Sequence, residues 1–361
     1  MIAVIADDLT GAAELGGIGL RHGLKTEIST VVPSATTADL LVIAADSRSK
    51  EETAAVDEMT NLTRQLRSLQ PKWVYKKTDS VLRGHVIAEI NAHLQALDLQ
   101  SALLVPANPY LGRTIRDGKY YLDGQPIHKS AFSIDPEFPI GSSDLKDMLR
   151  APAHVRKTTE ELPTEGIVVG EVQENADLES WARRISPGTL AAGAAGFFSA
   201  LLDARVSKAL PPNDRPLLGS PLFFISGTTF ESNRAAIRRQ AAVGGPVSYM
   251  PDTPDDAWED GVIRLLQQEQ KAVIAVDDSR HDLTALQLRK TMATAVTHIL
   301  QKFLPAELFI EGGATAYAIL QQTGWHTFVP EQELAPGVVR MSVPAAPGIF
   351  ITVKPGSYRY E

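Results

Sequence analysis

The sequence predicts an α/β protein of two domains, each a largely parallel sheet flanked by helices, with a cleft between them. Short, continuous apolar runs end in polar or Gly-rich loops, a pattern typical of strands buried on both faces. Stretches with apolar residues three and four positions apart lie between several of these runs, and strands that alternate with helices form parallel sheets. The length of 361 residues also favours two domains, because one domain takes roughly 100–200 residues.

The first half of the chain carries five of the predicted strands. They cover residues 2–6, 40–45, 73–75, 102–105 and 167–169. Helices are expected over 53–69 and 85–97, and a further helix is expected to open after Asp7-Asp8. Segment 112–143 is rich in Gly, Pro, Asp and Tyr and shows little periodicity. We expect a long loop there, and loops of that length are often functional.

The second half repeats the alternation. Strands are expected at 222–225, 272–276, 308–310 and 349–353, with helices at 231–242, 256–268 and 284–303. Adjacent prolines at Pro211-Pro212, followed by Pro216 and Pro221, would stop a helix and stiffen a linker. The predicted organisation is a domain at 1–210, a linker at 211–221 and a domain at 222–361.

Composition excludes several classes of protein. Lys and Arg number 35 against 43 Asp and Glu, giving a net charge of −8, which argues against a protein that binds nucleic acid. The chain has no cysteine, so disulfides, thiolate metal sites and Cys nucleophiles are excluded. No apolar stretch approaches the roughly 20 residues of a membrane span. We expect no membrane partner, no signal peptide, since acids arrive at Asp7-Asp8, and a cytoplasmic location. A homo-oligomer is compatible with the sequence.

Candidate site residues follow the first strand. Asp8 and Thr10 stand where a helix would begin, so either could simply cap that helix. The alternative is functional, because ligands of open α/β sheets bind beyond the carboxyl ends of strands. Two adjacent acids repel each other, so capping explains only one of them.

A denser cluster follows the strand at 73–75. Within ten residues it holds three cations, one acid and two hydroxyls, namely Lys76, Lys77, Arg83, Asp79, Thr78 and Ser80. Lys and Arg at this place could clamp a carboxylate or a phosphate, and the start of the next helix would assist an anion. The alternative is a solvated turn with Asp79 or Ser80 as a cap. Arg48 could join the same pocket or lie on the surface.

Three Gly-containing loops in the second half each follow a predicted strand. They begin at Ser226-Gly227, at Glu311-Gly312-Gly313 and at Lys354-Pro355-Gly356. Glycine lets the backbone approach a phosphate closely, and free N–H groups at a helix start can bind it. Three such loops in one domain favour a nucleotide-phosphate site, although the sequence has no GxxxxGK[ST], GxSxG or HExxH motif.

These loops together resemble the four-carbon acid sugar kinase family, formerly a family of unknown function. In the first half the resemblance rests on Ile5–Ala12, Tyr75–Gly84, Pro106–Pro109 and Gly112–Thr114. In the second half it rests on Ser226-Gly227, Gly312–Thr315, Pro336–Val338 and Lys354–Gly356. It spans nearly the whole chain.

The resemblance implies a sugar-acid domain followed by an ATP domain. It implies that the acid contacts Asp8, Arg48, Lys77, Thr78, Asp79, Ser80 and Arg83. It implies that ATP contacts Ser226, Gly312, Gly313, Ala314, Thr315, Gly337, Lys354 and Gly356. The expected cofactors are ATP and Mg²⁺, and the expected partner is a small sugar acid.

The hypothesis is therefore an ATP-dependent kinase that phosphorylates a hydroxyl of a small sugar acid such as threonate or erythronate. Asp8 or Asp79 would orient or deprotonate the attacking hydroxyl. Thr228, Thr229 and Ser357-Tyr358-Arg359 depart from the family pattern. The alternative is thus a sugar-acid-binding protein of the same fold that has lost ATP turnover. A third hypothesis is another transferase or an isomerase on the same scaffold.

Overall fold

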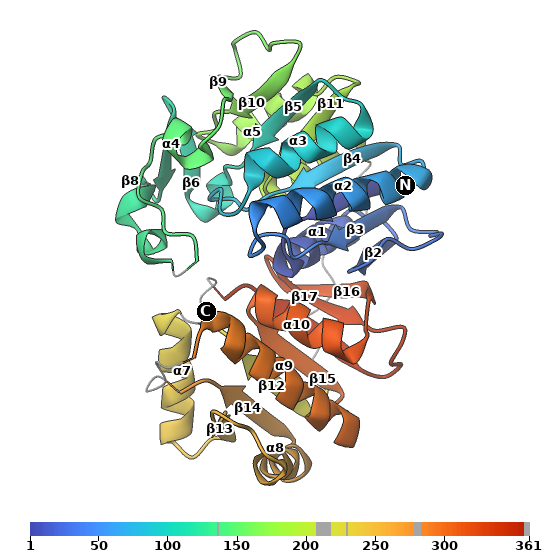
Figure 1. The fold of residues 1–361 in the computed structure, drawn as a ribbon, viewed down its shortest axis with the longest axis vertical. Coiled ribbons are helices and arrows are strands. Elements are labelled where there is room, and N and C mark those ends of the chain that lie inside the picture. Colours follow the sequence, from blue (N-terminus) through green and yellow to red (C-terminus); the bar gives the residue numbers. More distant parts are fainter. Residues whose placement is uncertain (136, 207–217, 229, 278–282, 357–361) are drawn as a thin grey trace. The chain divides into compact units, whose positions relative to one another are not determined.

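The computed structural model describes the chain apart from residues 136, 207–217, 229, 278–282 and 357–361. The chain divides into two compact units, Met1–Leu210 and Pro211–Glu361. Each unit contains its own helix-covered sheet (Figure 1). The expectations for Thr229, for Ser357-Tyr358-Arg359 and for most of the 211–221 linker fall outside the described residues.

A parallel sheet forms the middle of the first unit. Its strands lie in the order β2-β3-β1-β4-β11-β5-β10-β9, and neighbouring strands pair in parallel. In chain order they are β1 Ile2–Ala6, β2 Thr26–Ser29, β3 Leu40–Ala44, β4 Trp73–Lys77, β5 Ser101–Val105, β9 His154–Arg156, β10 Gly166–Gly170 and β11 Thr189–Gly193. Every residue of β1 and β3 is buried, as strands covered on both faces require. The predicted α/β class, with a largely parallel sheet flanked by helices, is confirmed.

Helices cover both faces of this sheet. They are α1 Leu9–Arg21, α2 Glu52–Ser68, α3 Val86–Leu97, α5 Asn175–Arg184 and α6 Ala195–Arg205; the unit also contains the short helix α4 Leu145–Leu149. Helices α2 and α3 pack together over a core that includes Ala3, Ile5 and Met59. Helix α6 packs against both α1 and α5. Because side chains alternate along a strand, every other residue of β1 and β4 faces α1 rather than α2.

The expectation of a long irregular loop at 112–143 was wrong. This segment forms a small antiparallel sheet of β6 Arg113–Arg116, β7 Lys119–Leu122 and β8 Gln125–Pro126. It continues through the short 3₁₀ helices η2 Ile127–Lys129 and η3 Ala131–Ile134, and η1 Pro109–Leu111 precedes it. Two turns at Asp117-Gly118 and Asp123-Gly124 have positive φ at both residues, the conformation that two-residue hairpins favour. The strands were missed because they are too short to show alternation.

The sheet of the second unit is mixed. Its strands lie in the order β13-β14-β12-β15-β18-β17-β16, parallel from β13 to β18 and antiparallel from β18 to β16. They are β12 Leu222–Ser226, β13 Val247–Tyr249, β14 Lys271–Ala275, β15 Glu307–Glu311, β16 Thr327–Ala335, β17 Val338–Ser342 and β18 Phe350–Lys354. The sequence analysis missed the β16–β17 hairpin.

Helices α7 Glu231–Ala242, α8 Asp256–Gln268, α9 Ala285–Lys302 and α10 Gly313–Thr323 cover this second sheet. Ile237 of α7 packs against Val273 and Ala275 of β14. Helices α8, α9 and α10 form a row, with α9 in contact with both of the others. The helices predicted at 231–242, 256–268 and 284–303 are all present, and the last begins and ends one residue inside its predicted bounds.

Candidate functional site

Three neighbouring strands of the first unit end at the same edge of the sheet. Ala6 at the end of β1 lies beside Ala44 of β3 and Lys77 of β4. The segments that follow these strands therefore meet there, and they carry the predicted residues Asp8, Arg48 and Asp79. Carboxyl ends of parallel strands are the usual place for ligands in open α/β sheets. We call the polar residues gathered at this edge the first site.

Arg48 is the centre of the first site. Its Nε donates to Oδ2 of Asp7 at 2.8 Å, its Nη1 lies 3.1 Å from Oδ2 of Asp8, and its Nη2 lies 3.7 Å from Oδ1 of Asp79. Burial acts to lower the pKa of the Arg48 guanidinium, but the three carboxylates outweigh it and hold that pKa well above its ordinary value. One buried cation thus holds three acids together.

Asp8 both caps a helix and belongs to the site. Its Oδ1 accepts a 2.8 Å hydrogen bond from the Gly11 backbone N–H, and the Thr10 hydroxyl donates to its Oδ2. Burial acts to raise the pKa of Asp8, but Arg48, Lys77 and these hydrogen bonds bring it below its ordinary value. Asp8 is therefore an ionised cap.

Asp7 has the opposite electrostatic character. Burial raises its pKa, and the neighbouring Asp8 carboxylate adds to this against the opposing charges of Arg48, Lys76 and Lys77. Its Oδ2 pairs with Arg48, whereas its Oδ1 is buried with no hydrogen-bond partner among the described residues. Environments that drive the pKa values of two neighbouring acids apart are characteristic of acid–base sites.

Lys76 and Lys77 separate onto opposite faces of the sheet. Lys77 pairs with Ala6 in the β1–β4 register, and its Nζ lies 3.1 Å from the Thr78 carbonyl oxygen and 3.8 Å from Glu14 Oε2. The nearby Gly11 leaves room for this side chain, because a Cβ there would lie 2.7 Å from Asp8 Oδ1 and 2.9 Å from Lys77 Nζ. Lys76 points to the α3 face and pairs with Glu89 at 2.6 Å. It therefore lies outside the first site.

Asp79 organises the loop that follows β4. It accepts two hydrogen bonds from the Arg83 guanidinium, at 2.9 and 3.0 Å, and one from the backbone N–H of Val81 at 3.1 Å. Burial acts to raise the pKa of Asp79, but Arg83 and Arg48 overcome it and hold that pKa far below its ordinary value. Asp79 thus accepts backbone hydrogen bonds in the turn, as a cap would, and also belongs to the predicted cluster of charges.

The antiparallel insertion reaches the first site through Arg113. Its guanidinium donates to the Ser80 hydroxyl, and the Tyr120 hydroxyl donates to the Ser80 carbonyl. Both Arg83 and Arg113 lie over the Phe132 ring, 5.4 and 5.7 Å from its centroid. Arg113 was not among the predicted site residues, because its approach to Ser80 depends on the hairpin fold of 113–122.

Several buried polar atoms near this edge have no hydrogen-bond partner within the part of the chain that the structure describes. They are Asp7 Oδ1, Ser47 Oγ, Thr78 Oγ1, Asn108 Oδ1 and Arg113 Nε. Buried polar atoms are nearly always hydrogen-bonded in folded proteins. These acceptors, hydroxyls and one cationic donor match a ligand that carries both hydroxyl groups and negative charge.

The predicted phosphate loops of the second unit also converge. Strands β12, β15 and β18 are neighbours, so Ser226-Gly227, Gly312–Thr315 and Lys354–Gly356 follow adjacent strand ends. A Cβ on Gly227 would collide with the Thr315 hydroxyl, and one on Gly356 would lie 2.8 Å from the Thr228 hydroxyl. Gly312 has φ of +108° at the N-cap of α10. This close backbone packing requires glycine at the loops. We call the three loops the second site.

Glu311 connects the three loops and was not among the predicted residues. Its Oε2 accepts from the Ser226 hydroxyl at 2.8 Å, and its Oε1 lies 2.8 Å from both Lys354 Nζ and Asn233 Nδ2. Asn233 also donates to the Gly356 carbonyl at 2.8 Å. The sequence signal was a charged residue at the end of an apolar strand. Its buried partners are 43, 78 and 85 positions away.

Gly337 lies apart from this network. It occupies the β16–β17 turn with φ of +73°, and its N–H donates to Glu333 Oε1 at 3.2 Å. The antiparallel register Val339↔Val353 places this turn at the end of the sheet where β18 finishes. Gly337 therefore shares an edge with the second site, with β17 and β18 between it and β15.

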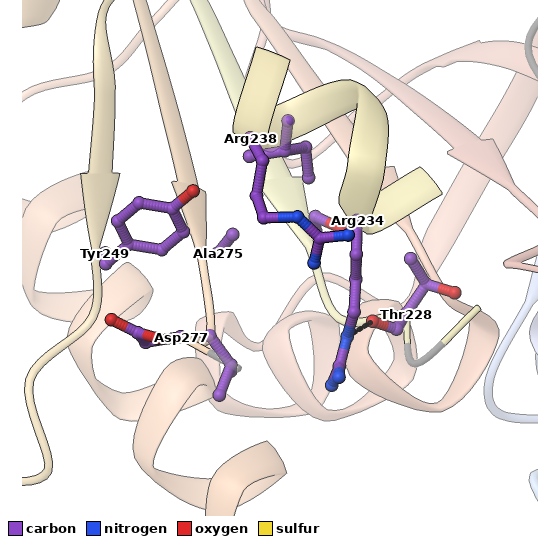
Figure 2. A pocket seen from close by; sticks show the side chains of 9 residues that line it. Thr228, Arg234, Arg238, Tyr249, Ala275 and Asp277 are labelled. Carbon is purple, nitrogen blue, oxygen red and sulfur yellow. Dashed lines mark hydrogen bonds between the residues drawn. The ribbon is translucent and has the colours of Figure 1, made fainter. Parts of the chain in front are cut away.

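A pocket lies beside the second site. It is lined by Ser226, Thr228, Arg234, Ile237, Arg238, Tyr249, Ala275, Val276 and Asp277. Figure 2 shows Tyr249 and Asp277 on one side and Arg234 and Arg238 of α7 on the other. Of these residues, sequence reasoning assigned only Ser226 to a site, because all the others except Thr228 come from α7, β13 and the end of β14.

The described residues form neither a side-chain cluster for a metal ion nor a helix that could span a membrane. They include no group of three or more His, Cys, Asp or Glu side chains arranged to hold a metal ion. None of their helices combines the length and the apolar character that a bilayer crossing needs.

The geometry of the first unit agrees with a match to a known family. A family model described as a sugar-binding N-terminal domain matches residues 2–201, more than half of the chain. The chain belongs to the four-carbon acid sugar kinase family. The resemblance noted in the sequence is thereby confirmed.

Curated relatives of this family cover most of the chain. A D-threonate kinase of Salmonella typhimurium is 27% identical over 92% of this chain and 89% of its own length. A 3-oxo-tetronate kinase of Pseudomonas savastanoi is 26% identical over 99% of this chain and 94% of its own.

Solved structures agree in fold. A Haemophilus influenzae protein superposes with a TM-score of 0.71 at 20% identity, covering 99% of this chain and 97% of its own. A Salmonella typhimurium protein gives a TM-score of 0.78 at 18% identity, covering 99% of this chain and 96% of its own.

Proposed function

We propose that this chain is a kinase that transfers the γ-phosphoryl group of ATP to a hydroxyl of a small sugar acid of the threonate or erythronate kind. The observation that carries the proposal is the first site, where Arg48, Lys77 and unpartnered buried hydroxyls gather at one strand edge. Relatives that span nearly the whole chain are named as kinases of four-carbon sugar acids. The alternative of a binding protein without turnover is not favoured by these relatives.

The first site supplies groups of two kinds for such a substrate. Lys77, Arg48 and Arg113 are cations that can neutralise a carboxylate, and Arg presents paired donors suited to it. The hydroxyls of Ser47, Thr78 and Ser80 can exchange hydrogen bonds with the hydroxyls of the acid. Arg83 contributes indirectly, because it holds Asp79 and with it the loop that carries Thr78 and Ser80.

Among the acids, the geometry favours the Asp7–Asp8 pair over Asp79 as the group that orients the attacking hydroxyl. Both oxygens of Asp79 are engaged by Arg83. Asp8 remains a candidate, although its oxygens accept from Gly11 and Thr10. Asp7 Oδ1 is unpartnered among the described residues. Its raised pKa also brings it nearer to the value that suits a general base.

The second site is proposed to hold the ATP phosphates. Helix α10 begins at Gly313, directly after its N-cap Gly312, so free N–H groups there can bind a phosphate. The other residues proposed to contact the phosphates lie at or just after the neighbouring strand ends, and they are Ser226, Ala314, Thr315, Lys354 and Gly356. Lys354 brings a positive charge. Gly337 is proposed only as part of the rim. Phosphoryl transfer needs chiefly positioning and charge neutralisation, which these loops can supply.

Mg²⁺ is the proposed metal, bound mainly through the phosphates. This ion commonly combines one or two carboxylates with substrate phosphate oxygens. Glu311 lies at the start of one phosphate loop and is the carboxylate of the second site proposed to assist this ion. The ion would neutralise charge on the transferred group.

The test is an ADP-release screen of the purified chain over four- to six-carbon sugar acids with Mg-ATP. Wild type should release ADP in an acid-dependent way. Lys77→Ala should lower kcat/KM by about 10- to 100-fold, as expected for the loss of a charged substrate contact. Lys72→Ala is the matched control, because Lys72 is exposed just before β4. Acid-independent ADP release, or equal activity of both variants, would count against the proposal.

A further inference from the structure

We propose that the pocket between α7 and strands β12–β14 binds the nucleoside part of the phosphate donor, with Tyr249 against the base and Asp277 on the ribose. This inference rests on the proposed function and extends it to residues that the phosphate loops do not include.

The pocket is continuous with the second site. Ser226 and Thr228 line it, and the same two residues contact Glu311 and Gly356 of the phosphate loops. Strand order places β14 and β13 on the side of β12 away from β15 and β18. A nucleotide with its phosphates at the β15 and β18 loops would therefore extend across the end of β12 into this pocket.

The lining of the pocket suits a nucleoside. The pocket is partly open to solvent and combines apolar with polar side chains, as small-molecule sites do. Ile237, Ala275 and Val276 give it an apolar wall, and the Tyr249 ring offers an aromatic face for a flat base. Figure 2 shows that Tyr249 and Asp277 share one side of this space.

Charged side chains of both signs line the pocket. Asp277 follows the carboxyl end of β14, where a carboxylate can accept hydrogen bonds from ribose hydroxyls. Arg234 donates from Nε to the Thr228 carbonyl at 3.3 Å, so its guanidinium lies at the border between pocket and phosphate loops. Arg238 pairs with Glu231 on the same helix. The positive charge of Arg234 at this border can neutralise the first phosphate of a nucleotide.

The test compares ATP with inorganic tripolyphosphate, which has the phosphates but no nucleoside. Binding of each is measured by calorimetry on the full chain with Mg²⁺. Tyr249→Ala and Asp277→Asn should weaken ATP binding by about tenfold, the effect of losing one stacking or hydrogen-bonding contact. Both should leave tripolyphosphate binding within about twofold of wild type. Arg234→Ala should weaken both ligands, whereas Arg239→Ala, an exposed position on the same helix, should weaken neither.

The outcomes that overturn the inference are distinct. Unchanged ATP affinity in both pocket variants would place the nucleoside elsewhere and leave the proposed kinase activity standing. An equal loss of ATP and tripolyphosphate in Tyr249→Ala and Asp277→Asn, with an unchanged melting temperature, would make the pocket part of the phosphate site and contradict a nucleoside role. If wild type binds neither ligand, both the inference and the proposed function fail.

Discussion

At the residue scale, the first site depends on how tightly charges of both signs are packed. Arg48 contacts Asp7 and Asp8 and lies near Asp79, and Gly11 leaves room for Asp8 and Lys77 to approach each other. Sequence reasoning selected Asp8, Arg48, Lys77 and Asp79, because each follows a strand. It could not separate Asp7 from Asp8, since their opposite pKa shifts come from burial and from partners on other strands.

Gly11→Ala tests the close approach. The added Cβ would meet Asp8 Oδ1 and Lys77 Nζ at 2.7 and 2.9 Å, so the variant should lose about 1–3 kcal/mol of stability through overpacking together with most of its acid-dependent activity. Gly261→Ala in α8 is the matched helical control, because its nearest neighbour, Arg264 Nη2, is 3.7 Å away. It should be stabilised by about 0.5–1 kcal/mol. Equal behaviour in chemical denaturation would contradict the packing argument.

Asp79 should make stability depend on pH in a particular direction. Its folded-state pKa is far below the ordinary 3.8, so on acidification the unfolded chain takes up this proton first. The stabilisation is complete above 3.8 and is lost as pH falls from there toward the lowered folded pKa. Asp79→Asn lacks this contribution. The gap in unfolding free energy between wild type and Asp79→Asn should therefore narrow as pH falls from about 6 toward 3, and a constant gap would contradict it.

At the element scale, the strand ends determine which residues can meet. Most central strands were predictable within one or two residues, because β1, β3 and β15 are continuous apolar runs. The edge strands β9 and β13 have three residues each, and β6–β8 are short hairpin strands, so none shows a period. Strand β11 is followed directly by the apolar helix α6. The two form one continuous apolar stretch in the sequence, so neither element was predicted. Arg113 and Tyr120 were missed as site residues because they belong to these elements.

The Lys76–Glu89 pair ties β4 to α3 beneath the first site. Lys76 is fully buried and Glu89 is 2% exposed, so removing either partner leaves an uncompensated buried charge. Lys76→Met and Glu89→Gln should each cost about 3–5 kcal/mol. The double variant Lys76→Met/Glu89→Leu should be less destabilised than Lys76→Met alone. Thermal and urea unfolding measure this, and additive losses would show that the two charges are not coupled.

At the scale of the whole molecule, each unit presents one set of strand ends with a different chemistry. The first combines cations, acids and unpartnered hydroxyls, which suits a hydroxylated anion. The second combines glycine-bearing loops around Glu311 and Lys354, which suits phosphates. The two units at 1–210 and 211–361 thus carry sites of unlike chemistry. The alternation of strands and helices predicted the helix-covered parallel strands, whereas the links through Glu311 and Asn233 required the folded chain.

The measurement that tests the account most directly is ³¹P NMR of the purified chain with Mg-ATP and threonate or erythronate. The account predicts a new phosphomonoester resonance that grows in step with ADP and is absent when the acid is left out. Release of inorganic phosphate without any sugar-acid phosphate, for every acid offered, would contradict it.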